Sequence, residues 1–114
     1  MKKNGIKVFG LVVDNYTRCQ HYASKSDIIA IKFACCKKYY PCYKCHEQVQ
    51  QHKIALWSTN EFDSKAILCG ACGNELTINQ YLMANSCVHC YALFNPKCSL
   101  HYHLYFDMTK SASC

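Results

Sequence analysis

The hydrophobic positions of this chain fall in short runs separated by polar and cysteine-rich stretches. Residues 5–13 are expected to form a strand or hairpin arm with a bulge or bend at Gly10, and residues 28–33 a second strand. The apolar runs at 54–57 and 66–68 have the length of further strands. The pattern therefore predicts short strands joined by irregular connections.

Two segments favour helices. Residues 43–53 contain no glycine or proline and are rich in helix-compatible side chains, and Thr77 is a suitable N-cap for a helix that ends near Ala84. The small polar residues 109–114 predict a frayed end. Together these elements predict a small, loop-rich α+β fold of short antiparallel strands and one or two short helices.

Composition limits how such a fold can be stabilised. Of the 114 residues, 11 are cysteine and 9 are tyrosine, and the aliphatic runs can fill only one small core. This cysteine content is well above ordinary usage. A chain of this size with so small a core usually needs disulfides or bound metal.

Metal is favoured over disulfides. The basic residues 1–8 are followed too soon by Asp14 and Arg18 for a secretory signal, and no apolar run approaches the roughly 18 residues of a membrane span. Six histidines accompany the cysteines, and disulfides make no use of histidine. We therefore expect a cytoplasmic protein without a membrane segment, stabilised by zinc.

The net charge gives little support to nucleic-acid binding. The formal value of +6 counts every cysteine as neutral, whereas nine thiolates and three zinc ions change it by −9 and +6, which leaves +3. Lys37, Lys38, Tyr39 and Tyr40 could form a basic and aromatic patch for single-stranded nucleic acid. The two lysines also lie beside predicted thiolate ligands and stabilise their charge, so nucleic acid is the minor alternative.

The clearest motif is a pair of Cys-x-x-Cys knuckles. Cys69 and Cys72 enclose Gly70, and 14 residues separate them from Cys87 and Cys90. Two intervening residues let both sulfurs of a knuckle face one ion, and this separation is close to that of four-cysteine zinc sites. A redox function would need only one such pair. We therefore predict a four-cysteine zinc site.

Eight more ligand-type residues lie between positions 19 and 52, and they predict two interleaved sites. Cys42 and Cys45 form a third knuckle. Cys19 and His21 alternate along an extended segment, so their side chains point the same way. We predict that these four residues form a Cys3His site.

The remaining four, Cys35, Cys36, His46 and His52, would form a Cys2His2 site. His46 and His52 are six residues apart, about 240° around a helix, so the chain must leave the helix between them. Cys35 and Cys36 either share one ion in a tight turn or divide between the two sites. In both cases Cys45 and His46 serve different ions, which locks the two sites together.

Several motifs resemble those of the CHY-type zinc finger family, from about residue 8 to Phe106. The shared segments are 19–22, 35–36, 40–47, 68–72, 76–78 and 94–98. The resemblance implies three zinc ions, in agreement with the sites above. The Lys-, Asn- and Ile-rich composition of the chain is typical of a short, bacterial, cytoplasmic member of the family.

The family occurs in two settings. In ubiquitin ligases the module precedes a RING domain, for which this chain has no room, so ligase activity is not implied. A short mitochondrial intermembrane-space member assists the assembly of small Tim chaperones and is proposed to keep its cysteine-rich clients free of zinc. For this chain, the resemblance to that member implies a helper function.

A trailing group of ligand-type residues could add a fourth zinc. Its members are Cys98, His101 and His103, with His89, Asp107 or Cys114 as a further ligand. The alternative is that residues 100–106 form a packed strand in which these histidines hydrogen-bond within the core.

These observations predict one domain over residues 1–114, with an interleaved two-zinc part at about 15–56 and a four-cysteine part at about 66–106. Each predicted site has four protein ligands and leaves no open position for water, so we do not expect an enzyme. The first hypothesis is a zinc-scaffolded protein-interaction module with an unknown partner. The alternatives are a zinc-handling or thiol-protecting helper for cysteine-rich clients, and a nucleic-acid binder.

Overall fold

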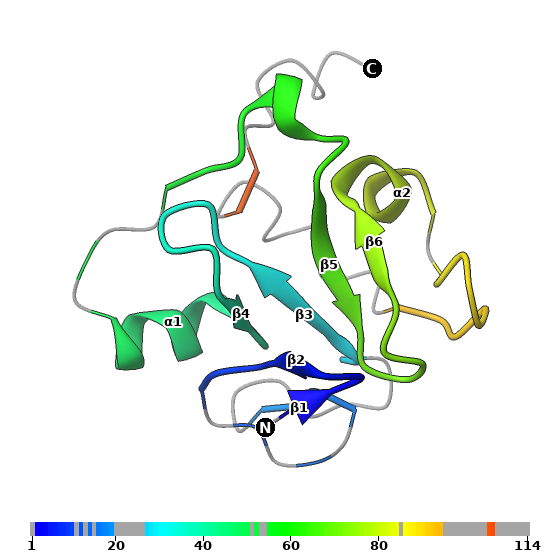
Figure 1. The fold of residues 1–114 in the computed structure, drawn as a ribbon, viewed down its shortest axis with the longest axis horizontal. Helices are drawn as coiled ribbons and strands as arrows, with labels where there is room; N and C mark the ends of the chain where they lie inside the picture. Colours follow the sequence, from blue (N-terminus) through cyan, green and yellow to red (C-terminus); the bar gives the residue numbers. More distant parts are fainter. Residues whose placement is uncertain are drawn as a thin grey trace.

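The centre of the molecule is a four-stranded antiparallel sheet in the order β4-β3-β5-β6 (Figure 1). The structure is a computed structural model that describes residues 2–10, 12, 14, 16–19, 27–50, 52, 55–84, 86–94 and 105–106. The strands are β3 (Ile29–Lys32), β4 (Tyr39–Tyr40), β5 (Lys65–Cys69) and β6 (Glu75–Thr77). The predicted loop-rich α+β fold is confirmed.

Both faces of the sheet are apolar because β3 and β5 carry apolar residues at successive positions. Ile31 pairs with Ile67, and both belong to the main core. Ala30 pairs with Leu68 and points to the opposite face, since successive side chains alternate across a strand. A smaller core covers that face and consists of Val8, Ala30, Tyr39 and Leu68. The sheet is thus a buried central layer.

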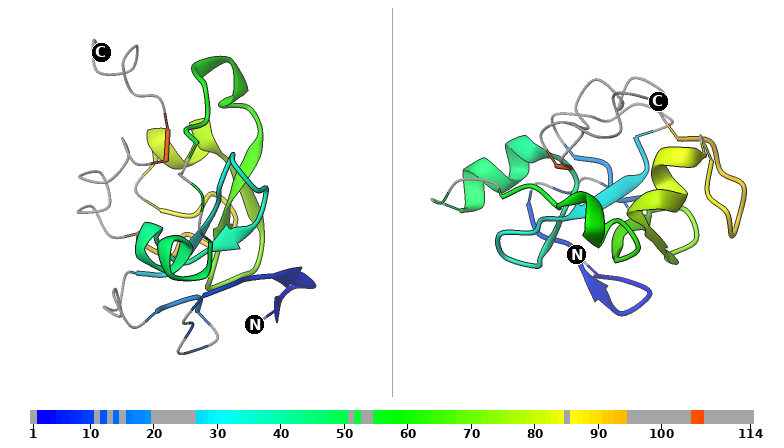
Figure 2. Two further views of the ribbon diagram at one scale, coloured as in Figure 1. Left: turned by 90° about the vertical axis from the view of Figure 1, so that its left-hand side faces the viewer. Right: turned by 90° about the horizontal axis from the view of Figure 1, so that it is seen from above.

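A hairpin of β1 (Lys2–Lys3) and β2 (Ile6–Lys7) contributes Ile6 to the smaller core and projects from the body at one end of the sheet (Figure 2). The predicted strand over 5–13 is wrong in its length, because regular pairing ends at Lys7 and Val8 forms only an isolated bridge to Tyr39. Residues 11 and 13 lie outside the described part. The predicted bend at Gly10 fits its φ of +100°.

Helix α1 (Tyr43–Val49) is shorter than the predicted 43–53. Its C-cap, Gln50, has extended backbone angles of −107° and 146°, and the Gln50 side chain donates a hydrogen bond to the Tyr40 hydroxyl. This exit turns the chain so that His52 comes close to His46 instead of continuing along the helix.

Helix α2 (Ile78–Met83) agrees with the prediction at both ends. The Thr77 hydroxyl accepts the backbone N–H of Gln80, and the Gln80 side chain accepts the backbone N–H of Thr77. This reciprocal capping box satisfies two otherwise unpaired N–H groups. The helix buries Ile78 and Tyr81 against the sheet.

The remaining elements are short and were missed or only partly predicted. The run at 66–68 became the longer β5, whereas in the run at 54–57 Trp57 forms an isolated bridge to Phe106, and residue 54 lies outside the described part. A short 3-10 helix, η1 (Thr59–Glu61), precedes β5. The tail at 109–114 and most of the predicted strand at 100–106 also lie outside the described residues.

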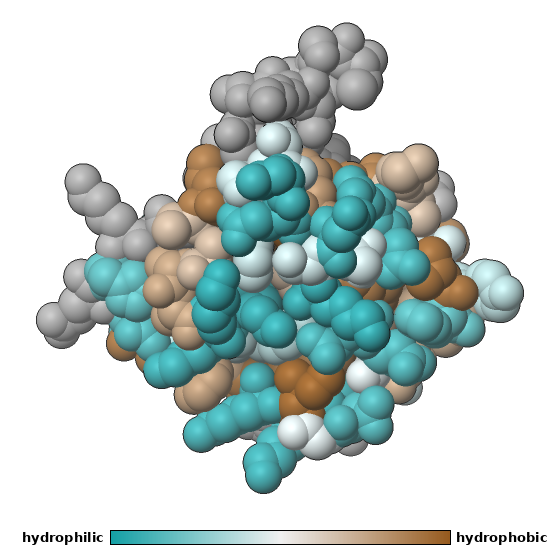
Figure 3. Space-filling model, turned by 45° about the horizontal axis from the view of Figure 1, so that its top comes forward, coloured by the Kyte–Doolittle hydropathy of each residue, from teal (hydrophilic) through white to brown (hydrophobic). Residues whose placement is uncertain are grey.

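Exposed apolar side chains occur in small groups. The face seen in Figure 3 is mainly hydrophilic, with hydrophobic residues between polar ones. Within the part of the chain that the structure describes, no helix has the length and apolar character needed to cross a bilayer.

Replacing Gly70 by alanine is expected to lower the free energy of unfolding by about 3 kcal/mol, because overpacking against rigid backbone is costly. A Cβ built on Gly70 would lie 2.0 Å from the carbonyl oxygen of Tyr16. Chemical unfolding in excess zinc measures the effect.

Gly5→Ala is the matched control for this substitution. A Cβ on Gly5 meets nothing within 4 Å, although its φ is +81°. It should cost only the strain of that backbone conformation, about 1 kcal/mol. Equal losses in the two variants would contradict the close packing of Gly70 on Tyr16.

Candidate metal centres

Three groups of cysteine and histidine side chains converge in the described structure. Within each group, one potential donor atom per residue lies within 4.8 Å of all the others. The groups are Cys19, Cys42 and Cys45; Cys35, Cys36, His46 and His52; and Cys69, Cys72, Cys87 and Cys90. They are called here the buried cluster, the histidine cluster and the four-cysteine cluster.

The sulfur separations fit a tetrahedral zinc ion. They are 3.6 Å for Cys19–Cys42, 3.9 Å for Cys35–Cys36, 3.8 Å for Cys69–Cys90 and 3.7 Å for Cys72–Cys87. A zinc–sulfur bond of about 2.3 Å in a tetrahedron places two sulfurs about 3.8 Å apart. A disulfide would bring them to about 2.05 Å. The donor sets and their spacing therefore suit zinc rather than disulfides.

The buried cluster joins the N-terminal segment to the start of α1. Cys19 forms an isolated bridge to Val12, and Cys42 is the N-cap of α1 with Cys45 one turn later. The three cysteines are at most 3% exposed. His21, the predicted fourth ligand, lies outside the described residues, so its place at this site stays a prediction.

Gly10 lets the chain pass close to this cluster. A Cβ on Gly10 would lie 2.7 Å from the Cβ of Cys45 and 3.1 Å from its sulfur. Only a residue without a side chain, at a φ of +100°, fits there. The bend that the sequence predicted therefore brings the segment after β2 close to a ligand-type cysteine.

In the structure, Cys35 and Cys36 belong to the same group, the histidine cluster. Both lie in the turn between β3 and β4, which is closed by hydrogen bonds from the Phe33 N–H to the Lys38 carbonyl (3.0 Å) and from the Lys37 N–H to the Phe33 carbonyl (2.7 Å). This tight turn directs both sulfurs to one group. Of the two alternatives, the structure shows the shared arrangement.

His46 and His52 complete this cluster. Their Nε2 atoms are 3.2 Å apart, and each lies 3.2 Å from the Cys35 sulfur. The His46 ring stacks on Phe33 at 4.5 Å, which fixes its orientation. Its Nδ1 is buried, with no hydrogen-bond partner among the described residues. Packing against Phe33 thus positions the His46 ring.

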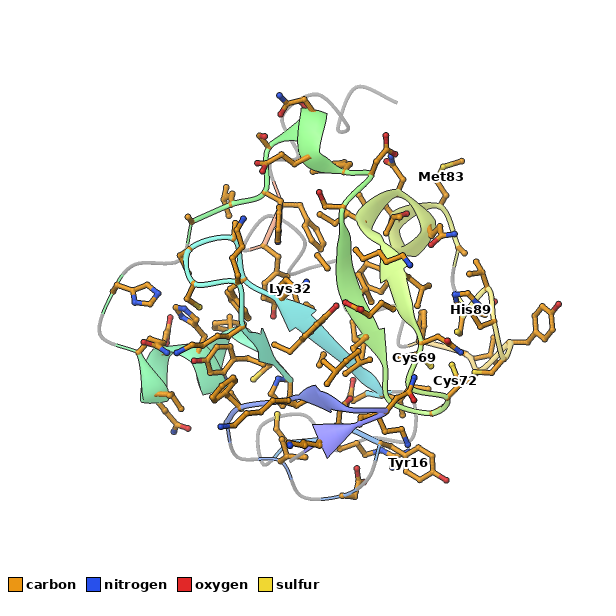
Figure 4. All side chains as sticks on the ribbon, viewed as in Figure 1. Tyr16, Lys32, Cys69, Cys72, Met83 and His89 are labelled. Carbon is orange, nitrogen blue, oxygen red and sulfur yellow. The ribbon has the colours of Figure 1, made fainter. Side chains whose placement is uncertain are left out.

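The four-cysteine cluster lies at the end of β5, where Figure 4 shows Cys69 and Cys72 together beside His89. The turn after Cys69 is closed by a hydrogen bond from the Gly73 N–H to the Cys69 carbonyl at 2.8 Å. The second knuckle is closed by the Tyr91 N–H bonding to the Cys87 carbonyl at 2.9 Å. Two hydrogen-bonded turns thus present the sulfurs to each other, as their spacing predicted.

The deeply buried thiols need a cation in order to ionise. Hydrogen bonding with Cys19 and Cys45, together with burial, raises the pKa of Cys42. Burial likewise raises the pKa of Cys69. A bound zinc ion supplies the positive charge that holds such groups as thiolates, and its binding therefore releases protons.

Cys72 and His46 are closer to the protonation state in which they bind zinc. Burial opposes ionisation of Cys72, but hydrogen bonds from the backbone and side chain of Asn74 bring its pKa down to about 7. Burial and the neighbouring His52 lower the pKa of His46, which favours the neutral imidazole that binds metal. The contribution of Asn74 was missed, because nothing in its sequence position marks it as a partner of a sulfur.

Neighbouring residues of α1 link two of the clusters. Cys45 belongs to the buried cluster and His46 to the histidine cluster, as expected for interleaved sites. The trailing group of Cys98, His101 and His103 lies outside the described residues, so a fourth site stays a prediction. His89 is exposed and belongs to none of the three groups found among the described residues.

Known proteins resemble this chain along most of its length. The CHY zinc finger family matches residues 19–100. The chain is 40% identical over 111 residues to Helper of Tim protein 13 of Saccharomyces cerevisiae, covering 94% of this chain and 96% of that protein. It is 36% identical over 100 residues to the protein of the same name from Kluyveromyces lactis, covering 88% of each.

An uncharacterized protein of Schizosaccharomyces pombe is 39% identical over 105 residues, which cover 92% of this chain and 93% of that protein. These three relatives are fungal, and they give no support to the expectation of a bacterial member. Together with the three clusters, the family match supports zinc as the bound metal.

Proposed function

The chain belongs to the CHY zinc finger family and binds zinc ions, and from this premise we propose that it is a zinc-scaffolded assembly helper for cysteine-rich Tim proteins. The observation that carries the proposal is the similarity to two proteins with the name Helper of Tim protein 13, which extends over 94% and 88% of this chain. A match of this extent includes all three clusters rather than one shared finger.

The proposal changes the expected location. The sequence alone favoured the cytoplasm, whereas similarity to helpers of Tim proteins supports the mitochondrial intermembrane space. That compartment is also the one of the short family member that the motifs resemble. There a zinc-binding helper would meet cysteine-rich clients before their thiols are oxidised.

An apolar surface beside the four-cysteine cluster supports client binding. Met83, at the end of α2, is 86% exposed, and Tyr91 and Leu93 in the following loop are 78% and 68% exposed. Leu93 pairs with Ser86, three residues beyond Met83, so the loop lies next to the helix end. Met83 and His89 lie on the same side of the molecule as Cys69 and Cys72 (Figure 4). Zinc would thus hold the loop that presents this surface.

Two observations favour a non-catalytic protein binder. The histidine cluster and the four-cysteine cluster each offer four donors, which leaves no open position on a tetrahedral zinc. Tyr39 and Tyr40, the aromatic members of the predicted nucleic-acid patch, are only 3% and 0% exposed. Rings buried in this way cannot stack on a base. Nucleic-acid binding therefore remains the lesser alternative.

Complementation in yeast tests the proposed function. In Saccharomyces cerevisiae lacking its Helper of Tim protein 13, this chain should restore assembled Tim complexes, measured by native electrophoresis of mitochondrial extracts. The variant Met83→Ser/Tyr91→Ser/Leu93→Ser should bind zinc but fail to restore them, because it lacks the apolar surface.

The control is Val49→Ser/Leu56→Ser, which removes two other exposed apolar residues, 49% and 45% exposed. It should restore assembly like the unchanged chain. The proposal would be wrong if the unchanged chain accumulated with zinc in the mitochondria and assembly were not restored.

A further inference from the structure

The three clusters differ in how far solvent reaches their donors. The cysteines of the buried cluster are at most 3% exposed. In the four-cysteine cluster, Cys69 and Cys87 are fully buried, Cys72 is half-buried and Cys90 is exposed. In the histidine cluster, His46 alone is buried, whereas Cys35 and Cys36 are half-buried and His52 is exposed. A competing ligand therefore has most access to the histidine cluster.

The exposed members of the two accessible clusters are held differently. Cys90 lies in a turn closed on both sides, by the Tyr91 N–H bonding to the Cys87 carbonyl and by the Cys87 N–H bonding to the Ala92 carbonyl, both at 2.9 Å. His52 lies beyond the end of α1. Its contacts within the described residues are with its own cluster, to the Cys35 sulfur and the His46 ring. His52 thus depends on the metal for its position more than Cys90 does.

The two clusters also differ in the net charge that they have with zinc bound. Two thiolates and two neutral imidazoles balance a zinc ion, whereas four thiolates leave a charge of −2. An approaching thiolate is repelled by the four-cysteine site but not by the neutral one. Exposed Lys37 and Lys38 directly follow Cys36, and they attract an anionic donor to the histidine cluster.

We propose that the zinc held by Cys35, Cys36, His46 and His52 is the exchangeable one, with His52 as the ligand that yields its place. The other two sites keep their zinc and maintain the fold. The inference rests on the proposed helper function for its biological purpose, because it identifies the site through which zinc would pass to or from a client thiol. The site assignment itself is independent of any client.

Zinc transfer to a chromophoric chelator, 4-(2-pyridylazo)resorcinol, tests the assignment on the full zinc-loaded chain. One equivalent should leave before the others. His52→Cys adds a third thiolate and should slow that first phase on the order of tenfold, whereas His52→Ala should accelerate it. His89→Ala is the matched control: it removes an exposed histidine that belongs to none of the three clusters and should leave the rate of the first phase unchanged. A first phase unaffected by His52→Cys, or a single phase for all zinc, would overturn the inference.

A measurement on the unchanged chain keeps the inference testable if a variant does not fold. Loading with cadmium-113 gives one NMR signal per site, and the signals separate by the number of thiolate ligands. The signal of the two-thiolate site should disappear first on addition of chelator. Earlier loss of the four-thiolate signal would contradict the assignment.

A reduced peptide with two cysteines distinguishes this inference from the proposed function. The peptide should accelerate the first phase of zinc release and leave the later phases unchanged. If the chelator draws the first equivalent from the histidine cluster while the peptide takes up no zinc, the site assignment holds and the helper function fails.

Discussion

Removal of zinc with a strong chelator is expected to unfold the chain and abolish its cooperative thermal transition. A structural zinc contributes on the order of 10 kcal/mol in small finger peptides, and the whole stability of a domain is about 5–15 kcal/mol. The apolar core is small, and ligand-type residues belong to it, including Cys19, Cys42, Cys45, Cys69 and Cys87. Without metal these buried thiols lose the ion that joins segments far apart in the chain.

Circular dichroism before and after chelation and dialysis, under reducing conditions, measures this loss. Addition of zinc should restore the transition, whereas magnesium should not, because it prefers oxygen ligands. A transition that persisted unchanged in the zinc-free protein would show that the packed sheet is sufficient and would contradict a structural role for the metal.

Cys69→Ser is expected to remove one zinc ion and to lower the free energy of unfolding by about 4 kcal/mol or more, as loss of a metal site does. Cys69 is fully buried at the end of β5, where it pairs with Ile29 and its sulfur lies 3.8 Å from that of Cys90. A serine oxygen is a poorer zinc ligand than a thiolate, and burying a hydroxyl costs more than burying a thiol. Elemental analysis and chemical unfolding measure both effects.

Two further substitutions control this experiment. Cys90→Ser changes an exposed member of the same cluster and should destabilise less, since no buried hydroxyl results. Cys114→Ser, outside the described residues, should keep the zinc content and the unfolding midpoint of the unchanged chain. If Cys69→Ser retained the full zinc content, the four-cysteine site would be wrongly assigned. Four ions in the unchanged chain would indicate that Cys98, His101 and His103 bind metal.

Local sequence signals were sufficient to predict features that are formed by residues close together in the chain. The two Cys-x-x-Cys knuckles around Cys69 and Cys87 fixed their own geometry, because two intervening residues suffice to aim both sulfurs at one point. Thr77 and Gln80 formed their capping box within four residues. The strand expected at 28–33 is β3, because a continuous apolar run suits a strand buried on both faces.

The tertiary structure decided whatever depends on residues far apart in the chain. Strands β4 and β6 are too short to be predicted from the pattern of hydrophobic residues. They form because they pair with β3 and β5. The close approaches of Gly10 to Cys45 and of His52 to Cys35 depend on the path of the chain after β2 and after α1. The sequence by itself determined which residues can bind zinc, since that is a property of side chains. The burial of each cluster, and the placement of Cys35 and Cys36 in one group, were decided only when the fold brought distant segments together.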